Sequence, residues 1–361
     1  MIIKKSPDEE ATSEGIGFAG ILCTYSDAKD IQEKFWDIFM GRKTYHEKSN
    51  GVMAWLLGLD GLKRSKDSAS DGDQDWILAL ITAYEKIQKG DWALPPSKTG
   101  LKSLEDIKKE IQRLITSFYN AHIKQRGSRY VYLATDGEWA KRGDGKDIYY
   151  ASYPDPYALC MFSKFDPAHN WQKVSNDVME LNEKILESYK DLGAQGQNPM
   201  PEKVFVSVKP DGSFKVENYY KISAKEGVTG DALKDNEEDS IRFFLRMARA
   251  AVLSGNEKAK QMLGKILEIT GVQKVSDPLL WARQYNNALA KAGYGIAAYG
   301  AGKSALAKAL LASVQSSFDG EGYKDWPEAK KYYYYQSVIF QSIMLGGTKE
   351  IIPSSIAGCS K

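Results

Sequence analysis

Segments with apolar residues at helical spacing return along most of this sequence, and this repetition constrains the fold more than any other feature. Apolar side chains three and four residues apart mark one face of an α-helix. Helix starts are marked by Asp71 and Ser103, and helix ends by glycines such as Gly90 and Gly255. The pattern covers residues 27–40, 73–88, 102–123, 171–189, 237–253, 257–269, 304–314 and 327–345. The sequence therefore predicts a mostly helical protein.

One stretch follows the alternation of a β-strand instead. Apolar residues alternate over 204–208, a Pro-Asp-Gly turn follows at 210–212, and alternation resumes over 214–216. This pattern predicts a β-hairpin, and residues 130–133 are compatible with another short strand. No run of strands indicates a parallel sheet. We expect the hairpin to be a small excursion from a helical body.

The spacing of the helical segments suggests how they are arranged. Helices return about every 30 residues, and 361 residues divided over ~12 helices gives that spacing, which fits a toroid of paired helices. No linker rich in proline or serine divides the chain. We therefore expect one all-α domain over residues 1–361, interrupted only by the hairpin.

Composition narrows the classes of function. The net charge of +2 is the difference between 49 basic and 47 acidic residues, so no overall field attracts nucleic acid or anionic lipid. Three cysteines without close spacing and three histidines give neither a disulfide framework nor a zinc site. No signal peptide or membrane-spanning segment is visible. We expect no cofactor and no nucleic-acid or membrane partner.

Two carboxylate-bearing segments stand at predicted helix entrances. Residues 68–73 (SASDGD) precede an apolar run, and in an ordinary helix Asp71 would cap the N-terminus while Asp73 would complement the dipole. In residues 12–15 (TSEG), the serine or threonine could likewise be a cap, with Glu14 in the first turn. Each segment alone has this ordinary explanation. The glycines beside Glu14 would also let a bulky ligand approach.

Taken together, the motifs resemble those of a known family. Residues 13–15 (SEG) and 69–73 (ASDGD) resemble, in order and spacing, the two signatures of glycoside hydrolase family 8. Residues 54–58 (AWLLG) resemble the Ala-Trp segment of this family, notably of its bacterial cellulose-synthesis-associated endoglucanases. Residues 238–242 (EDSIR) resemble the family's Tyr-Asp-Ala-x-Arg motif. Ser152-Tyr153 and Tyr332-Tyr333 fall where the family has Ser-Tyr and Tyr-Tyr pairs.

The chain departs from the family pattern at some positions. Glu238 stands in place of the usual tyrosine, Phe243-Phe244 replaces a common Pro-Trp, and the hairpin region lacks the expected Asp-Trp. Only thirteen residues precede Glu14, where the family normally has its first barrel helix. The resemblance implies an (α/α)6 barrel whose first helix is missing or shortened. Because the altered residues surround Asp239, the substrate stays open.

The resemblance also implies roles for named residues. Hydrolysis with inversion needs a protonated carboxyl at the leaving oxygen and a carboxylate that holds a water, ~6.5–9.5 Å apart. By resemblance, Glu14 is the general acid and Asp239 the general base, and Asp71 binds hydroxyls of the distorted sugar. Arg242, one helical turn after Asp239, would hold that base ionised or grip substrate hydroxyls. Contacts with substrate are implied for Trp55, which would stack on a sugar ring, and for Tyr153, Tyr332 and Tyr333.

The resemblance favours an endo-acting, monomeric enzyme that cleaves a β-1,4-glucan outside the cell or in the periplasm. Xylan and chitosan are alternatives, although chitosan would favour an acidic cleft. Two other classes stay open, a non-catalytic glycan-binding barrel and a helical scaffold for protein partners, but neither needs three acids at motif positions. Residues 297–304 (AAYGAGKS) fit a relaxed phosphate-binding loop, yet the strand that should precede such a loop is absent.

Overall fold

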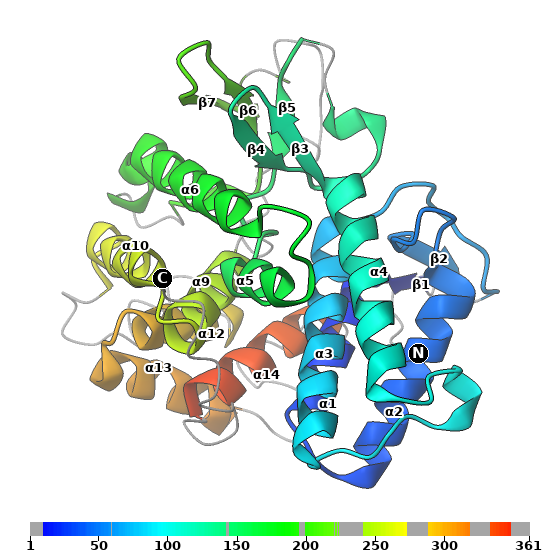
Figure 1. Ribbon diagram of the computed structural model, residues 1–361. Coiled ribbons are helices and arrows are strands. Elements are labelled where there is room, and N and C mark those ends of the chain that lie inside the picture. The colour runs from blue at the N-terminus through cyan, green and yellow to red at the C-terminus, as the bar shows by residue number, and fades with distance from the viewer. Residues whose placement is uncertain are drawn as a thin grey trace.

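The computed structural model describes residues 10–58, 60–141, 144–194, 199–219, 221, 223, 241–272, 288–317 and 333–347. Most of these residues are helical, which confirms the prediction from apolar spacing. None of the described helices is both long enough and apolar enough to cross a lipid bilayer. The structure consists of helices packed on helices, with small sheets at their ends (Figure 1).

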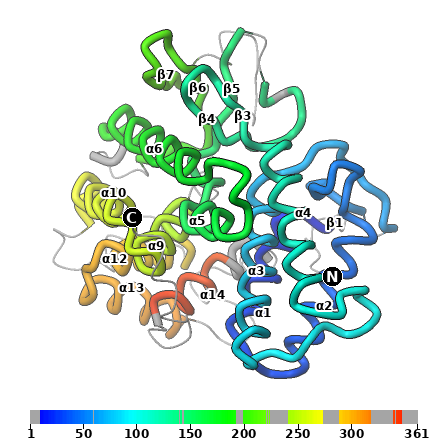
Figure 2. Tube along the Cα trace, viewed as in Figure 1, coloured from blue at the N-terminus to red at the C-terminus, as the bar shows by residue number. Residues whose placement is uncertain are grey.

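Six of the described helices form a ring of contacts. Taken in chain order, each packs against the next, and the last packs against the first. They are α1 (Ser13–Thr24), α3 (Ser70–Lys89), α5 (Pro156–Phe165), α9 (Arg242–Leu253), α12 (Ala288–Gly300) and α14 (Tyr333–Gly347). Figure 2 shows α1 and α3 on one side, α9 and α12 on the other, and α5 between them. The ring therefore joins the N-terminal and C-terminal parts of the chain.

Five further helices pack on the outside of this ring, one on each of five ring members. The outer helix α2 (Lys29–Gly41) packs on α1, and α4 (Leu104–His122) packs on α3. In the same way α6 (Trp171–Ala194) packs on α5, α10 (Glu257–Ile269) on α9, and α13 (Ser304–Ser317) on α12. The expectation of paired helices is therefore met for five of the six ring helices, and no further described helix pairs with α14.

The strands are more numerous than the single hairpin that the sequence predicts. The hairpin itself is confirmed as β6 (Val204–Val208) and β7 (Phe214–Asn218), but β5 (Asp147–Tyr149) adds a third antiparallel strand to it. Residues 130–133 are largely strand, because β4 (Arg129–Tyr132) pairs with β3 (Ile123–Arg126). A third sheet pairs β1 (Glu10–Thr12) with β2 (Leu56–Gly58). The all-α description was therefore wrong in detail, because strands of three or four residues are too short to show alternation.

An aromatic cluster holds α2 against α3. The Phe35 ring stacks on the Trp76 indole with 5.3 Å between ring centres, and Trp36 and Phe39 pack around the same pair. All four side chains are 2% exposed or less. Burying a large aromatic side chain contributes roughly 1.5–3 kcal/mol, so this cluster anchors the N-terminal half of α3. The acidic first turn of that helix is thereby fixed in place.

Helix ends show which residues act as caps. Thr12, rather than Ser13, caps α1, because its hydroxyl accepts from the Gly15 amide at 3.1 Å. Ser103 caps α4 as predicted, and Gly90 ends α3 in the left-handed conformation. The capping role expected for Asp71 was wrong, since α3 begins one residue earlier, at Ser70. Asp71 lies inside the first turn, where its carboxylate is available for other contacts.

Candidate active site

Three motif segments that are far apart in sequence meet at the N-terminal ends of α1, α3 and α9. Glu14 and Asp71 lie in the first turns of their helices, and Arg242 is the first residue of α9. Nη1 of Arg242 donates to Oδ2 of Asp71 at 2.7 Å and also to Oε1 of Glu14. A helix N-terminus carries a partial positive charge, which further favours carboxylates at these positions. The sequence motifs thus form one cluster of two acids and a guanidinium.

The members of this cluster differ in exposure. The side chain of Asp71 is 1% exposed and that of Arg242 is 5% exposed, whereas Glu14 is 16% exposed. Glu14 is therefore the acid that solvent or a ligand can reach, and Asp71 holds the guanidinium from beneath. The described partners of Arg242 are Glu14 and Asp71, and its expected role toward Asp239 or substrate hydroxyls stays a prediction. Asp239 lies outside the described residues.

Close packing of α1 on α3 brings the two acids together. A Cβ added at Gly72 would lie 2.6 Å from the carbonyl carbon of Ser13 and 2.7 Å from the Glu14 nitrogen. A Cβ added at Gly17 would lie 2.8 Å from the Gly72 carbonyl oxygen. Both glycines are required because only a hydrogen fits where the backbones meet. The glycine of the ASDGD segment therefore has a packing function.

The backbone of Trp55 connects Ser13 with the residue that precedes the SASDGD segment. Its carbonyl accepts from the Ser13 amide at 2.9 Å, and its amide donates to the carbonyl of Asp67 at 3.0 Å. The indole is 40% exposed, which is unusual for so large an apolar side chain. The structure places Trp55 beside the entrance to α1 with its side chain open to solvent.

Tyr153 completes the surroundings of the guanidinium. Its ring centre lies 4.9 Å from the Arg242 guanidinium carbon, a cation–π contact. Burial of the ring and the nearby Asp71 carboxylate raise the pKa of the Tyr153 phenol well above its ordinary value. The hydroxyl therefore keeps its proton at neutral pH and is available as a hydrogen-bond donor.

Beneath this cluster lies a layer of buried polar side chains that the motifs did not indicate. On α3 it includes Gln74 and Asp75, and on α9 it includes Arg246 and Arg249. Arg246 donates to Asp75 at 2.8 Å, and Arg249 donates to Asp155 at 2.5 Å. A signal for this layer was available: acids at 71 and 75 and arginines at 242, 246 and 249 each fall on one helix face.

Other predicted site residues have mixed outcomes. Asp73 does not join the cluster; its carboxylate accepts from the Met53 amide at 2.9 Å and lies 3.6 Å from His122. Tyr332 lies outside the described residues, and Tyr333 is the first residue of α14. Residues 297–304 lie on a helix–turn–helix, since α12 ends at Gly300 and α13 begins at Ser304. The strand required for a phosphate-binding loop is not there.

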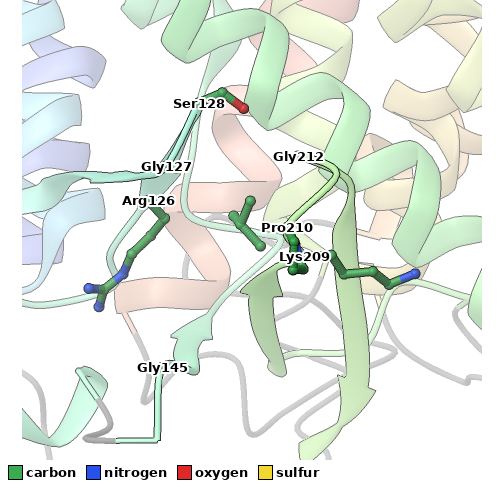
Figure 3. A pocket seen from close by; sticks show the side chains of 8 residues that line it. Arg126, Gly127, Ser128, Gly145, Lys209, Pro210 and Gly212 are labelled. Carbon is green, nitrogen blue, oxygen red and sulfur yellow. The ribbon is translucent and has the colours of Figure 1, made fainter.

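A separate surface cavity of about 400 Å³ lies among the hairpin loops of the outer sheets (Figure 3). None of the predicted site residues lines it, and the guanidinium of Arg126 is already held by Asp147 at 2.5 Å and 2.8 Å. Its lining residues are Arg126, Gly127, Ser128, Gly145, Val208, Lys209, Pro210 and Gly212. The cavity is distinct from the cluster around Glu14.

Cys23 and Cys160 differ in their bonding state. Cys23 is a free thiol, and burial raises its pKa to about 11. Cys160 is disulfide-bonded, although the number and spacing of the cysteines indicate no disulfide framework. Wide spacing in sequence does not prevent two thiols from meeting in a folded chain.

Solved structures with the same fold are found across almost the full length of the chain. A β-1,3-1,4-glucanase from Paenibacillus sp. X4 has a TM-score of 0.67 and 16% identity, covering 96% of this chain and 85% of that one. An endo-1,4-D-glucanase from Vibrio fischeri ES114 has a TM-score of 0.63 and 15% identity, covering 95% and 89%. A mutant of a reducing-end-xylose releasing exo-oligoxylanase has a TM-score of 0.62 and 15% identity, covering 95% and 84%.

Sequence comparison gives a family but no close relative. No curated protein matches the chain. The family described as glycosyl hydrolases family 8 matches residues 2–195, a segment that contains Glu14, Trp55, Asp71 and Tyr153. Because this segment is more than half of the sequence, the chain belongs to glycosyl hydrolases family 8.

Proposed function

We propose that this protein is an inverting glycoside hydrolase that cleaves internal β-1,4 linkages of a polysaccharide, with Glu14 as general acid and Asp239 as general base. The observation that carries the proposal is the contact of Arg242 with Glu14, 228 residues earlier, and with Asp71, 171 residues earlier. Glu14 and Asp71, which come from separate segments, would not share the Arg242 guanidinium unless the segments formed a common site. Family membership supports glycoside hydrolysis as the reaction.

The proposed architecture is a single (α/α)6-barrel domain over the whole chain. Support comes from the ring of six helices, in which α14 packs against α1, and from the helices that pack outside the ring. The shared fold with the glucanase and oligoxylanase structures supports the same arrangement. On this view the helix ends that carry Glu14, Asp71 and Arg242 lie at one end of the barrel.

The proposed chemistry begins from the cluster as it stands in the free protein. The guanidinium contact stabilises the charged form of Glu14, whereas a general acid must carry a proton. We infer that substrate draws Arg242 away from Glu14, while Asp71 remains its partner. Glu14 then takes up a proton from solvent and donates it to the leaving oxygen, while Asp239 accepts a proton from the water that attacks the opposite face of the sugar.

The substrate proposal is a β-1,4-glucan, with xylan and chitosan as alternatives. Trp55 offers an exposed indole next to the segment that carries Glu14, and sugar rings stack on such flat apolar faces. We propose that Trp55, Tyr153, Tyr332 and Tyr333 bind the polysaccharide. The guanidinium of Arg242 and the carboxylate of Asp71 supply hydrogen bonds to hydroxyl groups.

The proposed site of action is outside the cytoplasm, in the periplasm or the medium. The disulfide at Cys160 supports this, because disulfides persist in oxidising compartments. A polymeric substrate supports it as well, since such a chain does not enter the cell intact. We further propose that the protein acts as a monomer.

The test is release of reducing ends from cellulosic, mixed-linkage, xylan and chitosan substrates by the unmodified protein, Glu14→Gln and Asp239→Asn. Each substitution should lower kcat at least ~10²–10⁴-fold. Glu10→Gln, four residues before Glu14, and Glu238→Gln, next to Asp239, are matched controls that should retain activity. The anomeric configuration of the first product, followed by proton NMR, should be opposite to that of the cleaved bond.

Each outcome has a definite meaning. If Asp239→Asn retains full activity, the assignment of the base is wrong and a neighbouring acid performs it. If the product keeps the configuration of the substrate, the inverting mechanism is refuted. If the unmodified protein binds a glycan but cleaves none of the panel, the enzyme proposal gives way to a non-catalytic glycan-binding barrel.

A further inference from the structure

The backbone at Ser152 and Tyr153 is held from below by two buried side chains. Nη1 of Arg246 donates to the carbonyl oxygens of both residues. The side-chain amide of Gln74 donates to the same Tyr153 carbonyl at 3.0 Å. A carbonyl oxygen has two lone pairs, so the Tyr153 carbonyl is fully used. The peptide after Tyr153 is therefore fixed by donors from α9 and α3.

Gln74 holds the next turn of the chain as well. Its side-chain oxygen accepts from the Asp155 amide at 2.9 Å and from the Tyr132 hydroxyl at 3.3 Å. Gln74 is 0% exposed, so water cannot replace these partners. Losing either contact would leave a buried polar group unsatisfied, which is costly. The segment from Ser152 to Asp155 thus has one defined position.

Arg246 is itself held tightly in place. Its Nη2 donates to Oδ2 of Asp75 at 2.8 Å, and the residue is 1% exposed. A buried guanidinium cannot leave its carboxylate without a large penalty. The planar, forked geometry lets one side chain serve Asp75 on one nitrogen and two carbonyls on the other. Arg246 therefore connects α3 rigidly to the segment that bears Tyr153.

This arrangement extends to the predicted catalytic acid through Tyr153. The Tyr153 ring lies against the guanidinium of Arg242, 4.9 Å from its central carbon. Arg242 in turn contacts Glu14 and Asp71. A shift of the Tyr153 backbone would move the ring and remove one side of the pocket that orients Arg242. The position of Glu14 therefore depends on the hydrogen bonds that Arg246 and Gln74 make to the Tyr153 backbone.

We propose that Arg246 and Gln74 are positioning residues, which fix the Tyr153 backbone so that its ring orients Arg242 toward Glu14 and Asp71. The expected effect of these two residues on catalysis rests on the proposed hydrolytic function. The immobilised segment itself can be measured without substrate. Neither residue contacts the predicted reacting carboxyl of Glu14 in the described part of the chain.

The experiment compares Arg246→Lys and Gln74→Met with Arg129→Lys as matched control. Lysine keeps the charge beside Asp75 but cannot reproduce the fork, and methionine removes the Gln74 hydrogen bonds at similar volume. Arg129 also binds a carboxylate, Asp177 at 2.9 Å, and a carbonyl, Gly212 at 2.7 Å, but in the outer sheets. Circular dichroism first verifies that each variant is folded.

Two readouts then decide the matter. Hydrogen exchange of the peptide spanning residues 150–156, which contains the Asp155 amide held by Gln74, should become about tenfold faster or more in both variants. On the best cleaved polysaccharide, kcat should fall roughly 10–100-fold with less than threefold change in KM, because geometry rather than binding is lost. Arg129→Lys should alter neither readout.

Unchanged exchange in both variants would overturn the proposal, since the segment would not depend on these residues. Faster exchange with unchanged kcat would overturn its link to the reaction. A loss of binding, seen as a large rise in KM with constant kcat, would also contradict a positioning role. If the unmodified protein cleaves no substrate, the proposed function fails, while the exchange measurement still decides whether Arg246 and Gln74 fix the Tyr153 segment.

Discussion

Replacing Gly72 by alanine tests whether the contact between α1 and α3 sets the geometry of the site. The new Cβ would lie 2.6 Å from the carbonyl carbon of Ser13, whereas ordinary van der Waals contact begins at 3.4 Å. The two backbones must therefore separate by about 0.8 Å at this point. Backbone atoms cannot swing aside as a flexible side chain can, so the first turn of α1, with Glu14, has to move.

Two opposing effects determine the change in stability. Alanine favours a helix interior over glycine by ~1 kcal/mol, while overpacking a well-packed contact costs ~1–3 kcal/mol. We therefore expect a net destabilisation of about 0–2 kcal/mol, seen as a modest fall in Tm. Activity should fall far more, about 10²-fold in kcat/KM, because a displacement near 1 Å disrupts the reacting geometry. The signature is thus a large loss of rate in a nearly intact protein.

The matched control is Gly264→Ala. Gly264 lies within α10, and a Cβ there would meet nothing within 4 Å. This variant should be more stable by ~0.5–1 kcal/mol and fully active. Thermal unfolding and kcat/KM, measured side by side for the two variants, check the reasoning. A Gly72→Ala variant within threefold of the unmodified rate would refute the idea that this contact sets the position of Glu14.

Three further predictions concern other parts of the molecule. Trp55→Ala should raise KM roughly 5–10-fold with little change in Tm, because a stacking face worth ~1 kcal/mol is lost from an exposed position; equal effects of Trp55→Phe and Trp55→Ala in steady-state kinetics would contradict this. Asp136→Asn should destabilise the fold by ~1–3 kcal/mol, because the carboxylate accepts from Lys48, Asn50 and Ser68, whose contacts hold the pKa of Asp136 well below its usual range. A group with a lowered folded pKa stabilises above its unfolded pKa of ~3.9 and loses that contribution as pH falls below it, so the variant should show a shallower stability loss between about pH 4 and pH 2 in urea titrations. Alkylation should label one of the three cysteines, Cys23, in denaturant without reductant, and label it slowly in the native protein near pH 8, because its pKa is about 11; mass spectrometry showing three labelled thiols would contradict the disulfide at Cys160.

The outer helices could be predicted from sequence because each has one solvent-exposed face and one buried face. In α4, residues Ile107, Ile111 and Leu114 recur at helical spacing, and Ser103 supplies a cap. The expected span of 102–123 therefore matches Leu104–His122 closely. The outer helix α10 was predicted with the bounds it has, Glu257–Ile269. Amphipathic periodicity reports helices that lie between core and solvent.

Two helices of the inner ring, α5 and α12, were harder to find, although residues 73–88, 237–253 and 327–345 of the same ring show helical spacing. Nearly every side chain of α12 is buried, and its sequence, ALAKAGYGIAAYG, has no polar face to set a period. α5 spans only ten residues, of which Ser163 and Lys164 are exposed, so it offers too few polar positions to set a period. Neither helix was predicted. A helix surrounded by protein is not distinguished by periodicity from any other apolar run.

Some residues of the candidate site could be found from sequence motifs, and others only from the structure. Glu14, Asp71 and Arg242 were found because short motifs carry them, and the structure brings them into contact. Arg246 and Gln74 escaped notice, since their function depends on carbonyls of a loop about 80 to 90 residues away. Backbone partners leave no trace in a sequence pattern, because any residue supplies a carbonyl.

The contact of α14 with α1 has a consequence for how the chain folds. The last described helix must leave the ribosome before it can pack against the first. Arg242 likewise contacts residues that precede it by more than 170 positions, so the cluster of Glu14, Asp71 and Arg242 has a very high contact order. Nascent chains that stop short of α14 leave the apolar flanks of α1 and α12 uncovered, which makes them targets for chaperones. Activity should therefore appear in synthesis only after α14 has left the ribosome.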